Sequence, residues 1–97
     1  MNKSITVLDI PFVQQEVLKD PFVASVAISL SVANKKAQEC GIDLKESIIS
    51  ITQENSAEES FWRINYGPKN FINHRGGDLV IYVYQEDGRI YEVLRGQ

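Results

Sequence analysis

The sequence predicts an α+β fold: a short N-terminal helix and one long helix, followed by a four-stranded antiparallel meander packed on the long helix. Apolar residues recur at helical spacing up to Gly41 and at alternate positions beyond it, which separates a helical half from a sheet half. The chain has 97 residues, enough for a single domain, and its 43% apolar content can supply a dense core.

Each predicted helix begins at a proline, Pro11 or Pro21, a residue favoured at the first helical position. The helices are expected over about residues 11 to 19 and 21 to 40, with Asp20 capping the second and Gly41 ending it in the left-handed conformation. Spacings of three and four residues place an apolar stripe on the long helix, formed by Phe22, Val26, Leu30, Ala33, Ala37 and Cys40. The opposite stripe is Ser25, Ser29, Lys36 and Glu39.

Four segments between about residues 47 and 95 are rich in β-branched and aromatic residues and are predicted to be strands. They are Ser47 to Thr52, Glu59 to Tyr66, Asp78 to Gln85 and Arg89 to Arg95. The turn at Glu86-Asp87-Gly88 predicts that the last two strands form a hairpin. Ser4 to Leu8 is either a fifth strand or extended chain.

A three-residue loop in this hairpin would pair Val83 with Tyr91 and Tyr84 with Ile90, and a two-residue loop would shift the pairing by one. With the longer loop, Leu79, Ile81, Val83 and Val93 are expected to face the long helix. The other sheet face would carry Tyr82, Tyr84, Ile90 and Leu94, and large apolar patches of this kind usually need a cover. This face could be covered in one of two ways: by a second copy of the chain, which would give a homodimer, or by the predicted helix over residues 11 to 19.

The composition excludes several classes of function. Thirteen acidic residues outweigh ten basic ones, for a net charge of -3, which excludes nucleic-acid binding by bulk charge. One cysteine, Cys40, and one histidine, His74, can form neither an internal disulfide nor a tetrahedral zinc site. The longest nearly apolar run, Phe22 to Ala33, is too short to span a bilayer, and the chain starts without a signal-peptide pattern, so a cytoplasmic location is expected.

No catalytic constellation emerges from the sequence. Cys40 lies on the apolar stripe at a helix C-terminus, where the helix dipole does not activate a thiolate, and is interpreted as a small core residue. The carboxylates of Glu54, Glu58 and Glu59 fall in a polar connector and are interpreted as solvated. We therefore expect no enzyme activity, no cofactor and no metal. Trp62 is interpreted as a core residue because it alternates with other large side chains.

The segment from Gly67 to Gly77 is longer than an ordinary hairpin loop. It contains Lys69, His74 and Arg75, and together with Arg63 these form a candidate cationic site for an acidic protein partner or a small anion. The alternative interpretation is a wide structural connection in which the paired glycines permit a bend.

Several parts of the second half resemble known families: Phe61 to Tyr66, Gly76 to Ile81, Asp87 to Ile90 and the ending Arg95-Gly96-Gln97. They look like those of small PepSY-like domains and are similar to immunity proteins of the nuclear-transport-factor-two-like fold, which share a tryptophan strand, a double glycine, a glycine hairpin and a terminal glycine. The resemblance covers about residues 22 to 97 and implies a cystatin-like grip of a helix on a curved sheet. It also implies binding or inhibition of another protein without catalysis.

The function expected from the sequence is therefore a non-catalytic protein-binding or inhibitory module. The alternative is a small-molecule-binding domain that uses a pocket between helix and sheet. A closed cavity above about 300 Å³ would favour the alternative.

Overall fold

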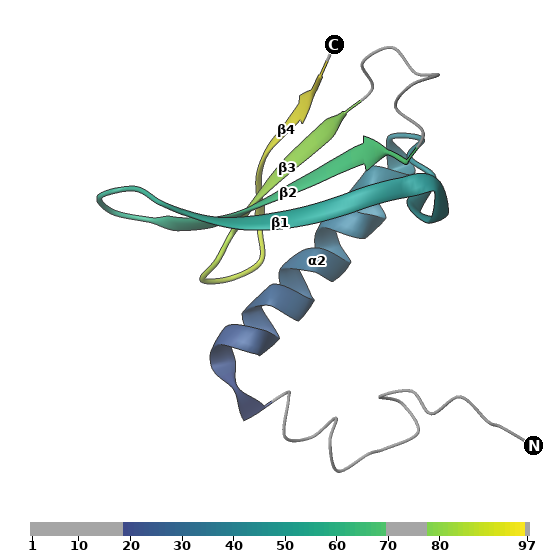
Figure 1. Cartoon of the computed structure of the whole chain (residues 1–97). Coiled ribbons are helices and arrows are strands. Elements are labelled where there is room, and N and C mark those ends of the chain that lie inside the picture. The colour runs from purple at the N-terminus through teal and green to yellow at the C-terminus, as the bar shows by residue number, and fades with distance from the viewer. Residues whose placement is uncertain (1–18, 70–77, 97) are drawn as a thin grey trace, which may run out of the picture.

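The computed structural model describes residues 19–69 and 78–96, and it has the predicted α+β architecture (Figure 1). Helix α2 (Pro21–Glu39) leads through a short 3-10 helix, η2 (Leu44–Glu46), into the sheet. The four strands pair antiparallel in the order β1-β2-β3-β4, so the predicted meander is confirmed. The described residues contain one α-helix; the predicted helix from residue 11 and the segment Ser4 to Leu8 lie outside them, apart from Lys19.

Helix α2 begins and ends where the sequence predicts. The Asp20 carboxylate accepts hydrogen bonds from the backbone N–H groups of Phe22 and Val23, at 2.8 and 3.3 Å, and so satisfies amides that a helix start leaves unpaired. At the other end Gly41 has a φ of 90°, a conformation that glycine adopts without strain. The backbone N–H of Ile42 then donates to the carbonyl of Ala37, which closes the terminus.

The core lies between α2 and the two central strands. Its buried side chains are Ala33 and Ala37 from α2, Trp62, Ile64 and Tyr66 from β2 (Ser60–Pro68), and Leu79, Ile81 and Val83 from β3 (Leu79–Tyr84). The two alanines allow a close approach of helix to sheet. The alternation expected for Trp62 and for the three residues of β3 is confirmed.

The prediction for the polar side of α2 is wrong at two serines. Ser29 is buried, and Ser25 contacts the sheet: its hydroxyl accepts a hydrogen bond from Trp62 Nε1 at 3.0 Å and donates to the carbonyl of Gln85 at 2.7 Å. The indole N–H needs an acceptor when buried, and the serine supplies it. The helix is therefore rotated, and Phe22 and Ile28 remain exposed.

Strand β1 (Ser47–Asn55) forms one edge of the sheet and extends beyond its predicted end at Thr52. All nine of its residues pair with β2 in an uninterrupted register, from Ser47 opposite Pro68 to Asn55 opposite Ser60. Helix α2 packs mainly on β2 and β3. The isoleucines of β1 consequently remain exposed on both faces, at Ile48, Ile49 and Ile51.

The hairpin between β3 and β4 (Ile90–Arg95) is confirmed, but its register near the turn differs from the prediction. Ile81 pairs with Val93 and Tyr82 with Glu92 as expected, whereas Val83 pairs with Ile90 because the register shifts by one residue between Tyr82 and Val83. This β-bulge turns Ile90 toward the core, and the assignment of Ile90 to the outer face is wrong.

Candidate functional site

The sheet face opposite α2 carries a cluster of aromatic side chains from three strands. The aromatic cluster consists of Phe61 (β2), Tyr82 and Tyr84 (β3), and Tyr91 (β4). Ring centroids are 5.2 Å apart for Phe61 and Tyr84, 4.9 Å for Phe61 and Tyr91, and 5.3 Å for Tyr84 and Tyr91. These separations fall in the favourable range for tilted and edge-to-face pairs, so the rings support one another.

Strand register explains how the cluster forms. Phe61 lies directly opposite Tyr84 in the β2–β3 ladder, and both point away from α2 because their neighbours Trp62 and Val83 point toward it. The bulge supplies the fourth ring: Tyr91 is the extra residue between Ile90 and Glu92, and its side chain joins Phe61 and Tyr84.

One corner of the cluster is fixed by a charged pair in the β3–β4 turn. The Arg89 guanidinium lies 4.5 Å from the centroid of the Tyr84 ring, and its Nε donates to Asp87 at 2.7 Å. Asp87 also accepts a hydrogen bond from the backbone N–H of Arg89 at 2.9 Å. That backbone hydrogen bond, followed by the side-chain one, lowers the pKa of Asp87, and the hydrogen bond to Asp87 raises the pKa of Arg89.

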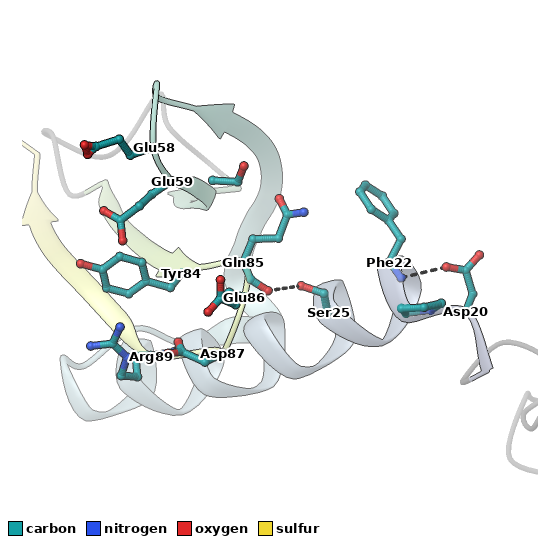
Figure 2. Close-up of a pocket in the computed structure, with 12 residues that line it drawn as sticks. Asp20, Phe22, Ser25, Glu58, Glu59, Tyr84, Gln85, Glu86, Asp87 and Arg89 are labelled. Atoms are coloured by element: carbon teal, nitrogen blue, oxygen red, sulfur yellow. Dashed lines mark hydrogen bonds and ion pairs between the residues drawn. The ribbon is translucent and has the colours of Figure 1, made fainter.

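A hollow of about 670 Å³ opens beside this corner, between the start of α2 and the sheet (Figure 2). Five of its lining side chains are acidic: Asp20, Glu58, Glu59, Glu86 and Asp87. Asp20 caps the helix and Asp87 pairs with Arg89. The other three carboxylates form no ion pair within residues 19–69 and 78–96. Arg89 also lines the hollow, where it is paired with Asp87 and attracted to Glu59, so the five carboxylates outnumber it and make this end of the molecule acidic.

The hollow is an open depression and not the closed helix–sheet cavity considered from the sequence, because the space between α2 and the central strands is filled by the core. Glu59 and Tyr84 both line it, so it adjoins the aromatic cluster (Figure 2). The two features form one continuous surface at the turn end of the sheet.

The structure places two of the four residues of the predicted cationic site, Arg63 and Lys69, far apart. Arg63 lies in the middle of β2, where it forms a 3.8 Å ion pair with Glu54 of β1. Lys69 follows the end of β2, about 20 Å away along an extended strand, and its backbone N–H donates to the carbonyl of Glu46. His74 and Arg75 lie outside the described residues.

Of the predicted interface residues, Tyr82, Tyr84 and Leu94 lie on the outer face, and Ile90 does not. Sequence analysis missed Phe61 and Tyr91. Alternation with Trp62 could have placed Phe61 on the outer face, since neighbouring residues of a strand point to opposite sides. Tyr91 carried no such signal, because the bulge that moves it depends on the geometry of the turn.

Cys40, the cysteine considered for catalysis, packs beside the core as the sequence predicts. Cys40 is partly buried beside the core, and its carbonyl accepts a hydrogen bond from Arg95. Residues 19–69 and 78–96 contain no group of histidine, cysteine and acidic side chains that could hold a metal ion. No helix within these same ranges has the length and apolar character to cross a membrane.

Comparisons with protein-family models, with curated proteins and with solved structures found no match to this chain.

Proposed function

We propose that the protein is a non-catalytic module that binds another protein through the outer face of its sheet. The observation that carries this proposal is the aromatic cluster, four rings on the face that α2 leaves uncovered. Tyrosine and phenylalanine offer large contact areas with few rotatable bonds and are enriched in interface cores. Leu94, exposed on the same face, extends the apolar area.

The charges around the cluster favour a partner segment that carries arginine or lysine. Glu92 lies opposite Tyr82 on this face, and Glu59 lines the adjoining hollow. Two arginines also lie beside the cluster, but Arg63 is paired with Glu54 and Arg89 with Asp87. Tyr84 already stacks with a guanidinium, that of Arg89, so the cluster is suited to cation–π contacts. An acidic partner for Lys69, His74 and Arg75 stays a separate prediction. Inhibition, the role implied by the sequence resemblance, would follow if the bound segment belongs to a functional surface of the partner.

Affinity purification from native lysate with matched baits tests this proposal. The wild-type chain is compared with Tyr91→Ala and with Ile28→Ala, because Tyr91 and Ile28 are exposed to a similar extent, 53% and 55%, and Ile28 lies on α2, outside the aromatic cluster. We expect the Tyr91 variant to lose a partner that both other baits retain. For the purified pair, loss of a central interface tyrosine corresponds to an affinity decrease of about 30-fold. Equal retention by all three baits would contradict the proposal.

The second candidate function is binding of a cationic small molecule in the hollow. Its volume of about 670 Å³ and its five acidic lining side chains support this candidate. A screen of polyamines and aromatic amines by thermal shift tests it, with a Glu59→Gln, Glu86→Gln double variant as the control. A ligand that stabilises the wild type and the double variant equally does not bind in the hollow.

A further inference from the structure

We infer that the free edge of β1 pairs with β1 of a second copy, which joins two sheets into one antiparallel sheet of about eight strands. The surface is different from the aromatic cluster: it is the hydrogen-bonding edge of the sheet together with the exposed isoleucines beside it. This inference goes beyond binding of a foreign protein, because the partner is the chain itself.

The edge of β1 lacks the features that normally prevent pairing. One side of the strand is fully paired with β2, and no described residue pairs with the other side. Its segment Ser47 to Gln53 contains no charge and no proline, and its register has no bulge. Long, regular and uncharged edges of this kind are templates for a further strand.

The other edge of the sheet provides an internal comparison. Strand β4 carries the charged residues Glu92 and Arg95, and its ladder with β3 is interrupted by the bulge at Tyr82 and Val83. Charges and bulges are two of the features by which proteins protect a sheet edge. Only one of the two edges in the described sheet is therefore unprotected.

The apolar side chains of β1 are exposed together with its outer backbone edge. Ile49 and Ile51 point to the same side as Tyr66 and Ile64, their partners on β2, yet each is 37% exposed because α2 lies over the central strands. Ile48, on the outer face, is 56% exposed. A strand added at this edge would cover side chains on both faces.

A second β1 fits this edge in a symmetric register. With Ser50 opposite Ser50 of the other copy, Ile49 faces Ile51 twice and Ile48 faces Thr52 twice, so four isoleucines become neighbours on the helix side. A two-fold axis through the sheet keeps both helices on one face and both aromatic clusters on the other. Seven residue pairs, 47 to 53, then form about seven backbone hydrogen bonds without any charged residue between them.

Like charges meet only at the two ends of the paired segment, where Glu54 comes opposite Glu46. Glu54 is already paired with Arg63 at 3.8 Å, which reduces this repulsion. The symmetric register therefore joins the uncharged segments and leaves the charged flanks exposed to water.

The first test measures the mass of the full chain in solution. Light scattering at about 100 μM should give twice the monomer mass of 11.0 kDa. Ile49→Lys should be monomeric, because a charge in the four-isoleucine cluster would be buried without a partner. Leu94→Lys is the matched control: it places the same charge at an exposed apolar position far from β1 and should remain dimeric. Circular dichroism establishes that both variants fold.

The second test measures the register by disulfide trapping in a Cys40→Ala background. Ser50→Cys should form a covalent dimer under mild oxidation, because the two Cα atoms would lie about 5 Å apart across the axis. Thr52→Cys should not, because its two copies would be separated by four residues along the strands, about 13 Å.

A monomeric wild-type chain overturns the inference, and so does a dimer that Ile49→Lys leaves intact or one that Thr52→Cys traps as readily as Ser50→Cys. A monomer in which the β1 amides that face away from β2 are protected from hydrogen exchange overturns it too, because another segment of the same chain would then cover the edge. None of these outcomes bears on Tyr91, so the inference and the proposed protein-binding function fail separately.

Discussion

Replacing Ile64 or Ile51 with alanine measures how far the cover of α2 extends across the sheet. The two isoleucines are directly paired on neighbouring strands and point to the same face, yet Ile64 is fully buried and Ile51 is 37% exposed. The two substitutions remove the same three carbon atoms. Any difference in their effect therefore reports the surroundings and not the chemistry of the residue.

The expected magnitudes follow from burial. At about 0.8 kcal/mol for each buried carbon, Ile64→Ala loses about 2.4 kcal/mol of transfer free energy. The cavity left between α2 and β3 raises the total to about 3 to 4 kcal/mol. Ile51 has solvent on one side and no closed cavity to leave, so Ile51→Ala should cost about 1 kcal/mol in the monomer.

Urea denaturation followed by tryptophan fluorescence measures both values, since Trp62 is the only tryptophan and lies in the core. The protein is kept dilute so that dissociated chains are compared. The slope of the free energy against urea should be unchanged, because the same surface unfolds. Equal losses for the two variants would refute the argument, since they would mean that β1 is as well covered as β2.

Two further predictions concern polar groups inside the fold. Ser29→Ala should leave the free energy of unfolding unchanged or raise it by up to about 1 kcal/mol, because the buried Ser29 hydroxyl has no hydrogen-bond partner within residues 19–69 and 78–96. Ser25→Ala should instead lower the free energy of unfolding by about 1 to 2 kcal/mol, because it leaves Trp62 Nε1 unpaired. Urea denaturation of the two variants checks this order. Burial raises the pKa of Tyr66 to about 12 in the folded state, so the folded protein holds this proton more tightly than the unfolded chain, and stability should be constant with respect to this group below pH about 10 and fall between pH about 10 and 12. Tyr66→Phe should remove that part of the alkaline loss, and a wild type and variant with identical stability profiles above pH 10 would contradict the assignment.

The sequence was sufficient for the parts of the fold that depend on local chemistry. Asp20 and Pro21 define the start of α2 and Gly41 its end, and alternation assigns Trp62 to the core. These features depend on capping, on backbone conformation and on the period of two in a strand. Each of them is determined by residues that are close together in the sequence, so it can be predicted from the sequence alone.

The candidate surfaces were less accessible to sequence analysis because they depend on how elements meet. The rotation of α2 that buries Ser29 follows from the need of Trp62 for an acceptor on Ser25, two residues that are far apart in the sequence. The position of Tyr91 depends on a one-residue shift in the hairpin. The separation of Arg63 from Lys69 follows from the length of β2, which continues to Pro68 and not only to Tyr66.

The two proposed surfaces have a common origin in the relative widths of a helix and a sheet. A helix with its side chains is about 10 to 12 Å across, whereas neighbouring strands are about 4.8 Å apart, so one helix covers the width of two to three strands. In this four-stranded sheet α2 packs mainly on β2 and β3. The bulge turns Ile90 of β4 toward that core, while nothing comparable brings the isoleucines of β1 under the helix. In the described part of the chain no further helix or strand covers the opposite face, and that face carries aromatic side chains where a sheet exposed only to water would carry polar ones. Within residues 19–69 and 78–96, apolar residues therefore remain exposed at two places that α2 does not cover, the edge strand β1 and the outer face, and these are the two surfaces that we propose for association with other chains.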